Sequence, residues 1–305
     1  MIEIQGLTKE YDGRRVVDEL SFDVRPGVVT GFLGPNGAGK STTMRLILGL
    51  DRPTAGRALV GGRPYAELAQ PLRQVGALLD AQAVHGGRTA RGHLRWIAAS
   101  NGLPERRIGE VLAQVGLAEA AGRRIRGFSL GMRQRLGVAA ALLGDPPVLL
   151  LDEPVNGLDP EGIRWIRTLL RDLAAEGRAV LVSSHLMTEM ALTADHLVVI
   201  GRGRLLADAA TAEFIDRHGR PRIRVRAVDP AKLAALLGAG DHGLDATEVD
   251  GGAWEVTGAE PERIAALAAA DGVVLYEIAV QHDSLEEAFM RMTADSVEYR
   301  AEAAA

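Results

Sequence analysis

The chain has 305 residues, of which 47% are hydrophobic and 25% charged, so it can bury one large core or two domains and is not broadly disordered. Its net charge of −5 gives no basic surface of the kind that nucleic acids favour, and we predict no nucleic-acid partner. The absence of cysteine excludes disulfides, thiolate nucleophiles and cysteine-ligated metals. Because we find neither a membrane-spanning apolar run nor a signal-peptide pattern, we expect a soluble chain that reaches a membrane only through a partner.

The first part of the chain alternates short apolar runs with turns. Residues 2–4 and 20–24 alternate like strands, and the polar residues 8–13 between them predict a turn that carries Tyr11. An apolar run at 28–33 predicts a buried strand, and 43–48 predicts a helix. They flank Gly34-Pro35-Asn36-Gly37-Ala38-Gly39-Lys40-Ser41-Thr42, which fits the phosphate-loop pattern G-x-x-x-x-G-K-[ST].

The residue types of this loop suit a triphosphate. Glycines let the backbone N–H groups point inward, and the helix N-terminus that follows adds a partial positive charge. Lys40 would place a full charge at the β- and γ-phosphates, and the Ser41 hydroxyl would complete the coordination of Mg²⁺. The alternative is a glycine-rich turn with a surface lysine. Lysine is scarce in this chain, however, which argues against its falling at the required position by chance.

The middle of the chain predicts a parallel sheet interrupted by helices. Residues 89–126 have a helical, arginine-rich pattern and form an inserted block. Further on, the pattern predicts helices at 133–143, 163–175 and 187–193 and strands at 148–151, 179–182 and 197–200. This alternation indicates a mostly parallel sheet covered on both faces, whose ligand binds at the carboxyl ends of the strands.

Three side chains at that edge are candidates for chemistry. The strand 148–151 ends in Asp152, suited to hold Mg²⁺ through water, and Glu153, suited to polarise the water that attacks the γ-phosphate. An apolar strand that ends in an acidic turn is the simpler interpretation, but the phosphate loop favours a function. His185 follows the next strand, and we expect it to contact the γ-phosphate rather than to be an ordinary surface histidine.

The C-terminal part begins with a predicted linker at 217–221. Beyond it we expect strands at 222–226, 253–256 and 273–280 and helices at 230–237 and 261–269. The last helix starts with the capping box Ser284-Leu285-Glu286-Glu287. These elements predict a small α+β domain without a cluster of reactive groups.

Five motifs in a fixed order resemble the nucleotide-binding subunit of an ABC transporter over about residues 2–215. The motifs are the loop 34–42, Phe128-Ser129-Leu130-Gly131-Met132-Arg133-Gln134-Arg135, Asp152-Glu153-Pro154, Asn156-Gly157-Leu158-Asp159 and His185. The resemblance implies an α/β P-loop NTPase fold of ABC type over 1–216, with antiparallel N-terminal strands and a helical subdomain at about 89–143. The small α+β domain would occupy 222–305, and its segment 284–289 resembles the C-terminal extension of daunorubicin/doxorubicin-resistance exporter ATPases.

The resemblance also assigns roles. Two such subunits would enclose two ATP molecules, with Ser129, Gly131 and Met132 of one chain facing the γ-phosphate bound by the other, and Asp159 bridging the sites. Ser129 could also be an ordinary helix N-cap. Tyr11 would stack on adenine, although a tyrosine packed on its own sheet is the alternative. The nucleotide-binding positions implied are Gly34, Asn36, Gly37, Ala38, Gly39, Lys40, Ser41 and Thr42, with Ser41 and Asp152 at Mg²⁺.

Two positions depart from the family pattern. Leu130 and Met132 stand where glycine and glutamine are usual, so contacts across the dimer there are expected to differ. Where the family places a Mg²⁺-contacting glutamine, the chain has Asp80, followed by Gln82. Asp80 could serve the metal as a hard oxygen ligand, or neither residue touches it.

These features predict an ATP-hydrolysing subunit of an exporter of drugs, antibiotics or lipids. It would act as a homodimer or heterodimer, bound through an integral-membrane permease to the cytoplasmic face of the cell membrane. An importer ATPase, a non-transport ABC ATPase and an ATP-dependent dimerisation switch without turnover are the alternatives. Glu153 and His185 argue against the last of these.

Overall fold

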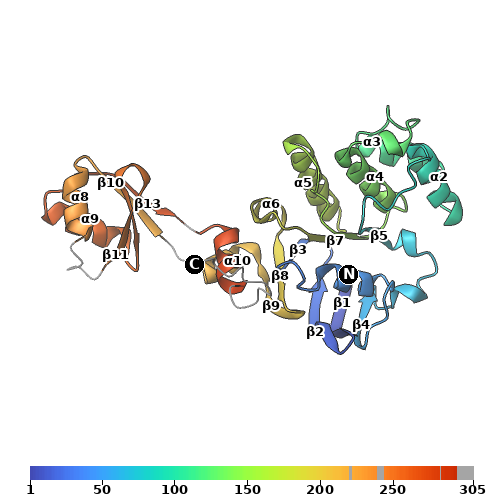
Figure 1. Ribbon diagram of the computed structural model, residues 1–305, viewed down its shortest axis with the longest axis horizontal. Helices are drawn as coiled ribbons and strands as arrows, with labels where there is room; N and C mark the ends of the chain where they lie inside the picture. The colour runs from blue at the N-terminus through green and yellow to red at the C-terminus, as the bar shows by residue number, and fades with distance from the viewer. Residues whose placement is uncertain (220–221, 239–243, 282, 294–305) are drawn as a thin grey trace. The chain divides into compact units, whose positions relative to one another are not determined.

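A computed structural model describes residues 1–219, 222–238, 244–281 and 283–293 (Figure 1). The described chain forms two compact units: unit 1 contains residues 1–211 and Thr293, and unit 2 contains residues 212–292. The predicted division into 1–216 and 222–305 stays a prediction, and its last part, 294–305, lies outside the described residues. Across the described ranges no helix has both the length and the apolar character needed to cross a bilayer.

Unit 1 begins with a three-stranded antiparallel sheet. Its order is β2-β1-β4, with β1 at Ile2–Tyr11, β2 at Arg14–Val24 and β4 at Ala55–Val60. The turn predicted at 8–13 is wrong for residues 8–11, which continue β1, and only Asp12 and Gly13 turn. Thr8 tolerates this place because its buried hydroxyl donates to Gly6 O and accepts from Glu19 N–H.

The central sheet of unit 1 has six strands in the order β5-β6-β7-β3-β8-β9. Neighbouring strands run parallel except for β9, which is antiparallel to β8. The mostly parallel sheet is therefore confirmed, and the carboxyl ends of β3, β6 and β7 meet at one edge. The strands are β3 (Val29–Leu33), β5 (Val75–Leu78), β6 (Val148–Leu151), β7 (Ala179–Ser183), β8 (His196–Gly201) and β9 (Arg204–Ala210).

Helices and the N-terminal sheet lie on opposite sides of the central sheet (Figure 1). On one side are α5 (Pro160–Ala175) and the inserted helices, and on the other is the three-stranded sheet. One apolar core joins the two sheets and includes Phe32, Met44 and Leu150, all fully buried. Met44 belongs to α1 (Lys40–Ile47), while α6 (Met187–Thr193) follows β7.

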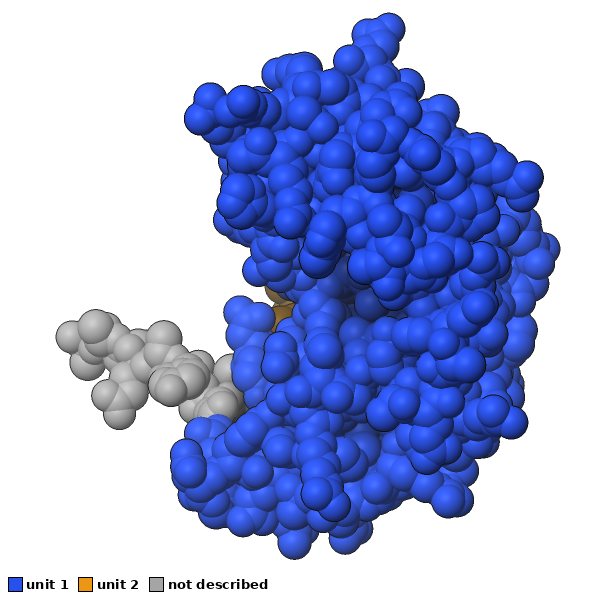
Figure 2. All heavy atoms as spheres, turned by 90° about the vertical axis from the view of Figure 1, so that its right-hand side faces the viewer, with its two compact units in different colours: residues 1–211, 293–305 blue, residues 212–292 orange. Residues whose placement is uncertain are grey.

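The helical block consists of α2 (Ala90–Ser100), α3 (Arg106–Gln114), a 3₁₀ turn (Ile125–Gly127) and α4 (Leu130–Leu142). Its apolar side chains are buried at Leu94, Ile108 and Leu112. Figure 2 shows the surface of unit 1 indented between an upper part, which contains these helices, and a lower part, which contains the N-terminal strands.

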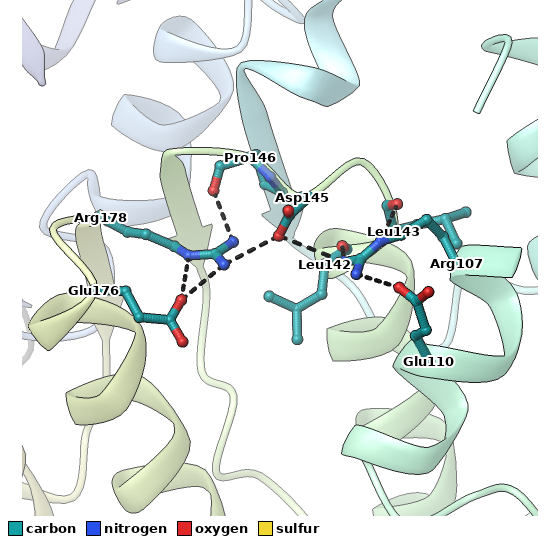
Figure 3. A network of polar contacts seen from close by, with 8 residues as sticks. All are labelled: Arg107, Glu110, Leu142, Leu143, Asp145, Pro146, Glu176 and Arg178. Carbon is teal, nitrogen blue, oxygen red and sulfur yellow. Dashed lines mark hydrogen bonds and ion pairs between the residues drawn. The ribbon is translucent and has the colours of Figure 1, made fainter. Parts of the chain in front are cut away.

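A network of polar contacts anchors the end of α4 (Figure 3). Arg107 of α3 donates from Nη2 to Leu142 O at 3.0 Å and from Nε to Leu143 O at 3.5 Å. The positive charge of Arg107 also interacts favourably with the negative C-terminal end of the helix dipole. Asp145 lies 3.5 Å from Arg107 and 3.0 Å from Arg178, which precedes β7. The network therefore ties the helical block to the sheet.

Unit 2 is a four-stranded antiparallel sheet with helices. Its strand order is β11-β12-β10-β13, and Leu233, Trp254 and Ile264 are among its buried core residues. The predicted capping box is present: Ser284 N–H donates to Glu287 Oε2 at 2.8 Å, and Glu287 N–H donates to Ser284 Oγ at 3.2 Å. Its strands are β10 (Arg222–Ala227), β11 (Asp245–Val249), β12 (Ala253–Thr257) and β13 (Leu275–Gln281), and its helices α8 (Pro230–Gly238), α9 (Pro261–Ala270) and α10 (Leu285–Thr293).

The linker predicted at 217–221 is wrong in its first part. Arg217 and His218 form the last turn of α7 (Thr211–His218), where Arg217 pairs with Glu213 one turn earlier. Residues 220 and 221 lie outside the described residues.

Candidate functional site

The glycine-rich loop joins β3 to α1 at the carboxyl edge of the central sheet. Gly39 has φ +104°, and a β-carbon added there would come within 2.6 Å of Val16 O, so only glycine fits. A surface pocket of about 310 Å³ adjoins the loop. The lining residues are Val16, Asn36, Gly37, Ala38, Gly39, Lys40, Ser41, Thr42, Asp152 and Glu153.

Lys40 is held in the loop by backbone carbonyls. Its side chain is only 9% exposed, and its Nζ donates to Gly34 O at 2.6 Å and to Pro35 O at 3.2 Å. Burial lowers the pKa of Lys40, and the carboxylates of Glu153 and Asp152 oppose that shift. A phosphate oxygen is a stronger acceptor for an ammonium than a neutral carbonyl, so this lysine is placed to exchange its partners for phosphate.

Ser41 and Asp152 meet across the pocket. Ser41 Oγ donates to Asp152 Oδ2 at 2.7 Å, and Ser183 Oγ donates to Asp152 Oδ1 at 2.5 Å. A hydroxyl and a carboxylate side by side are hard oxygen ligands, which Mg²⁺ uses together with water and phosphate oxygens. The residues present therefore fit a magnesium ion.

Glu153 and His185 form the second polar pair of the site. Glu153 Oε2 lies 2.7 Å from His185 Nδ1 and accepts from the His185 backbone N–H at 3.3 Å. Glu153 has φ +50°, a left-handed conformation that is unusual for a residue other than glycine. Its side chain is 24% exposed, so the carboxylate is shielded but reachable from the pocket.

Sequence patterns missed two residues that hold Glu153. Ser183 Oγ accepts from Glu153 N–H at 3.0 Å, and Gln134 Nε2 donates to Glu153 O at 3.1 Å. The available signals were weak: Ser183 shortly precedes His185 at the end of a strand, and Gln134 was one letter of the segment 128–135.

Tyr11 lies at the end of β1, away from the core. It is 42% exposed, its hydroxyl donates to Asp51 Oδ2 at 3.4 Å, and Lys9 Nζ lies 4.7 Å from its ring centroid. Burial and the nearby Asp51 raise the pKa of Tyr11. The exposed ring is thus available to a planar ligand.

Two residues that are expected to act across a dimer, Ser129 and Asp159, form hydrogen bonds within their own chain. Ser129 caps α4 by accepting from Met132 N–H at 3.2 Å, and Asp159 caps α5 by accepting from Gly162 N–H at 2.9 Å. A β-carbon on Gly131 would lie 3.0 Å from Gly157 O, so the signature segment packs closely on the loop after β6.

Asp80 lies beside the same carboxylates. Its Oδ1 accepts from Gln82 N–H at 2.7 Å. Asp80 and Gln82 line a second surface pocket, of about 380 Å³, together with Asp152 and Glu153. The structure therefore places both candidate residues at the site, where their described hydrogen bond is to each other and not to Ser41.

Comparisons with known proteins agree with this geometry. Residues 17–156 match a sequence family described as ABC transporter, and residues 221–286 match a domain of unknown function, DUF8746. The chain is 37% identical over 302 residues to an ABC transporter ATP-binding protein of Bacillus subtilis, YhcH, covering 98% of this chain and 97% of that protein.

Two further relatives carry more specific names. The bacitracin transport ATP-binding protein BcrA of Bacillus licheniformis is 34% identical, with 96% of this chain and 97% of that protein covered. The Nod factor export ATP-binding protein I of Rhizobium leguminosarum bv. viciae is 33% identical, with 97% and 96% covered. A solved structure of the ATP-binding subunit of an ABC transporter superposes with a TM-score of 0.65 at 29% identity, covering 71% of this chain and 92% of that one.

Proposed function

This chain belongs to the ATP-binding proteins of ABC transporters, and we propose that Glu153 and His185 carry out ATP hydrolysis in its pocket. Members of this family couple ATP hydrolysis to transport. The single observation that carries the proposal is the pocket lined by Lys40, Asp152 and Glu153, with His185 bound to the Glu153 carboxylate.

Each residue has a role that follows from its contacts. Lys40 binds the β- and γ-phosphates, while the backbone N–H groups of the loop 34–42 neutralise further charge. Glu153 polarises the attacking water, whose oxygen bonds to the γ-phosphorus as the bond to the bridging oxygen breaks and ADP and phosphate form. His185 orients the Glu153 carboxylate and donates to the γ-phosphate.

Ser41 and Asp152 would hold Mg²⁺, which supplies charge neutralisation at the phosphate oxygens when bound. Asp80 would reach the same ion as a further oxygen ligand. Tyr11 would bind the adenine ring by stacking, because its ring is exposed at the end of β1.

We infer that two ATPase subunits act together. The first turn of α4, with Ser129, Gly131 and Met132, would face the γ-phosphate bound by the other subunit, and Asp159 would lie between the sites. A helix N-terminus favours an anion, which supports this placement.

The full-length relatives support export as the direction of transport. One is a bacitracin transport ATP-binding protein and the other a Nod factor export ATP-binding protein, and both match nearly the whole chain, including unit 2. We therefore propose that the chain drives an exporter of antibiotics, drugs or lipids, bound through a membrane permease to the cytoplasmic face of the cell membrane.

The test is steady-state ATPase activity of the full chain as a function of its own concentration, beside the variant Glu153→Gln. Activity per chain should rise with concentration, and the variant should lose about 100-fold or more while still binding ATP by calorimetry, since the water-polarising group is gone but the loop is intact. Glu262→Gln, the same change on exposed α9, is the control. Near-normal turnover by Glu153→Gln would contradict the assignment. No turnover at any concentration, with ATP bound, would mean that another subunit completes the site.

A further inference from the structure

We propose that Gln134 is a positioning residue for Glu153: its side-chain amide holds the backbone of that glutamate so that the carboxylate faces the nucleotide pocket. This inference rests on the proposed function of Glu153. Gln134 belongs to the second turn of α4, the helix that Ser129 caps.

The backbone conformation of Glu153 must be stabilised by other residues. A φ of +50° brings the β-carbon of an L-residue close to its own backbone, and such conformations persist only where the surroundings impose them. Two side chains do so here. The Glu153 N–H donates to Ser183 Oγ at 3.0 Å, and the Glu153 carbonyl accepts from Gln134 Nε2 at 3.1 Å. Both peptide groups of the strained residue are therefore fixed.

Both holding groups are buried. Gln134 is 5% exposed and Ser183 is 0% exposed, so water does not readily replace either hydrogen bond. Ser183 also donates to Asp152 Oδ1 at 2.5 Å, which ties it to the proposed magnesium ligand. The side-chain amide of Gln134 donates from α4 to the carbonyl of Glu153, and among the described residues it has no hydrogen bond to Asp152.

The orientation of the carboxylate follows from that of the backbone. Glu153 Oε2 accepts from the His185 N–H at 3.3 Å and lies 2.7 Å from His185 Nδ1. A rotation about the Glu153 backbone would break this pair and turn the carboxylate away from the pocket. Gln134, Glu153 and His185 thus form one chain of contacts that runs from α4 to the strand end at β7.

The position of α4 is itself defined at both ends. At its first turn Leu130 packs against Gly157, four residues after Glu153. At its last turn Arg107 binds the carbonyls of Leu142 and Leu143 and joins the network that reaches Arg178 (Figure 3). A shift of α4 relative to the sheet would therefore move the amide of Gln134 against the carbonyl of Glu153. Through it, the segment that begins at Ser129 influences the hydrolytic residue of its own chain.

The experiment replaces the donor while keeping the side chain's length. In full-length Gln134→Met, the buried volume is nearly preserved but no N–H remains. We expect kcat for ATP to fall about ten- to hundredfold while KM changes less than about twofold, because only the placement of Glu153 is affected. Gln114→Met, on the exposed face of α3, is the matched control and should leave both constants unchanged.

Two further readouts separate positioning from general stability. Amide hydrogen exchange of residues 152–159 should become faster in Gln134→Met, with exchange in β3 and β8 unchanged. In the Glu153→Gln background, Gln134→Met should cause no further loss of turnover, since both act through one carboxylate. Uniformly faster exchange over unit 1, or additive losses of kcat, would overturn the inference and assign Gln134 a structural role only.

The outcomes distinguish the two proposals. If Glu153→Gln abolishes turnover but Gln134→Met retains normal kcat and normal exchange at 152–159, the inference fails and the proposed function stands. If Glu153→Gln turns over normally, the proposed function fails. Should the chain need another subunit for turnover, exchange at 152–159 alone decides: local acceleration supports the inference, and its absence refutes it.

Discussion

The side chain of Leu130 lies against the backbone of Gly157, so that a β-carbon added to the glycine would come within 2.3 Å of Leu130 Cγ and Cδ2. Gly157 has φ +73°, in the left-handed region that favours glycine. The loop between β6 and α5 is therefore shaped around the side chain of Leu130.

We expect Gly157→Ala to destabilise the protein by about 1–3 kcal/mol, because the methyl group adds both backbone strain and a clash with Leu130. Adding Leu130→Gly should restore only part of the loss, since it removes the clash and leaves the strain. Urea unfolding followed by circular dichroism measures both. Gly122→Ala is the control: its β-carbon would meet nothing within 4 Å, and its change should stay below about 0.5 kcal/mol. Equal stability of Gly157→Ala and wild type would refute the contact.

Lys40→Ala should weaken ATP binding itself. The ammonium is buried and already held by Gly34 O and Pro35 O at the floor of the pocket, so its loss removes a charge-assisted contact worth about 1.5–3 kcal/mol. The dissociation constant for ATP, measured by calorimetry, should rise at least about tenfold. The same substitution at Lys232, exposed on α8, should leave affinity unchanged. Unaltered affinity in Lys40→Ala would count against the phosphate-loop assignment.

Variants of Tyr11 distinguish stacking of its ring on adenine from packing of the ring on the N-terminal sheet. Stacking of a base on an aromatic ring is worth about 1–3 kcal/mol, so Tyr11→Ala should weaken ATP binding several-fold or more. Tyr11→Phe should bind ATP like wild type, because the phenol makes only a 3.4 Å hydrogen bond to Asp51. If Tyr11→Ala binds ATP normally but unfolds more easily, the ring serves the sheet and not the nucleotide.

The sequence predicted the structure best where one local pattern decides it. The loop 34–42 joins β3 to α1, the two carboxylates follow β6, and the capping box at Ser284 is formed, and each of these features depends on residues close together in the chain. The parallel direction of β3, β6 and β7 was also predicted, because continuous apolar runs indicate strands buried on both faces.

Helix starts, edge strands and the contacts of Glu153 were predicted less well. The helices α1, α4 and α5 begin three residues before their predicted starts, because Gly39, Ser129 and Asp159 occupy the N-cap positions ahead of the first apolar residue. The strands β4, β5, β9 and β11 were missed since they lie at sheet edges and lack a clear apolar alternation. The hold on Glu153 by Ser183 and Gln134 could not be predicted, as it joins residues 30 and 19 positions away.

Glu287 makes the stability of unit 2 depend on pH. The hydrogen bond from the Ser284 backbone N–H and the ion pair with Arg222 hold the pKa of Glu287 below its ordinary value of 4.5. Since the folded pKa is lowered, the ionised carboxylate stabilises the folded unit above pH 4.5, and this contribution is lost as the pH falls through the folded value. The side chain is 44% exposed, so solvent screening keeps the contribution to about 1 kcal/mol or less.

Glu287→Gln tests this directly. The amide can still accept from Ser284 but carries no charge for Arg222, so the variant should unfold at a lower temperature than wild type at pH 7. As the pH falls below 4.5 through the lowered pKa of Glu287, the wild-type carboxylate becomes protonated, and the two melting temperatures should converge. The matched control is Glu286→Gln, which makes the same charge change in the first turn of the same helix, at an exposed position. A difference between wild type and Glu287→Gln that is constant from pH 7 to pH 3, or that Glu286→Gln reproduces, would show that the charge of Glu287 is not what stabilises unit 2.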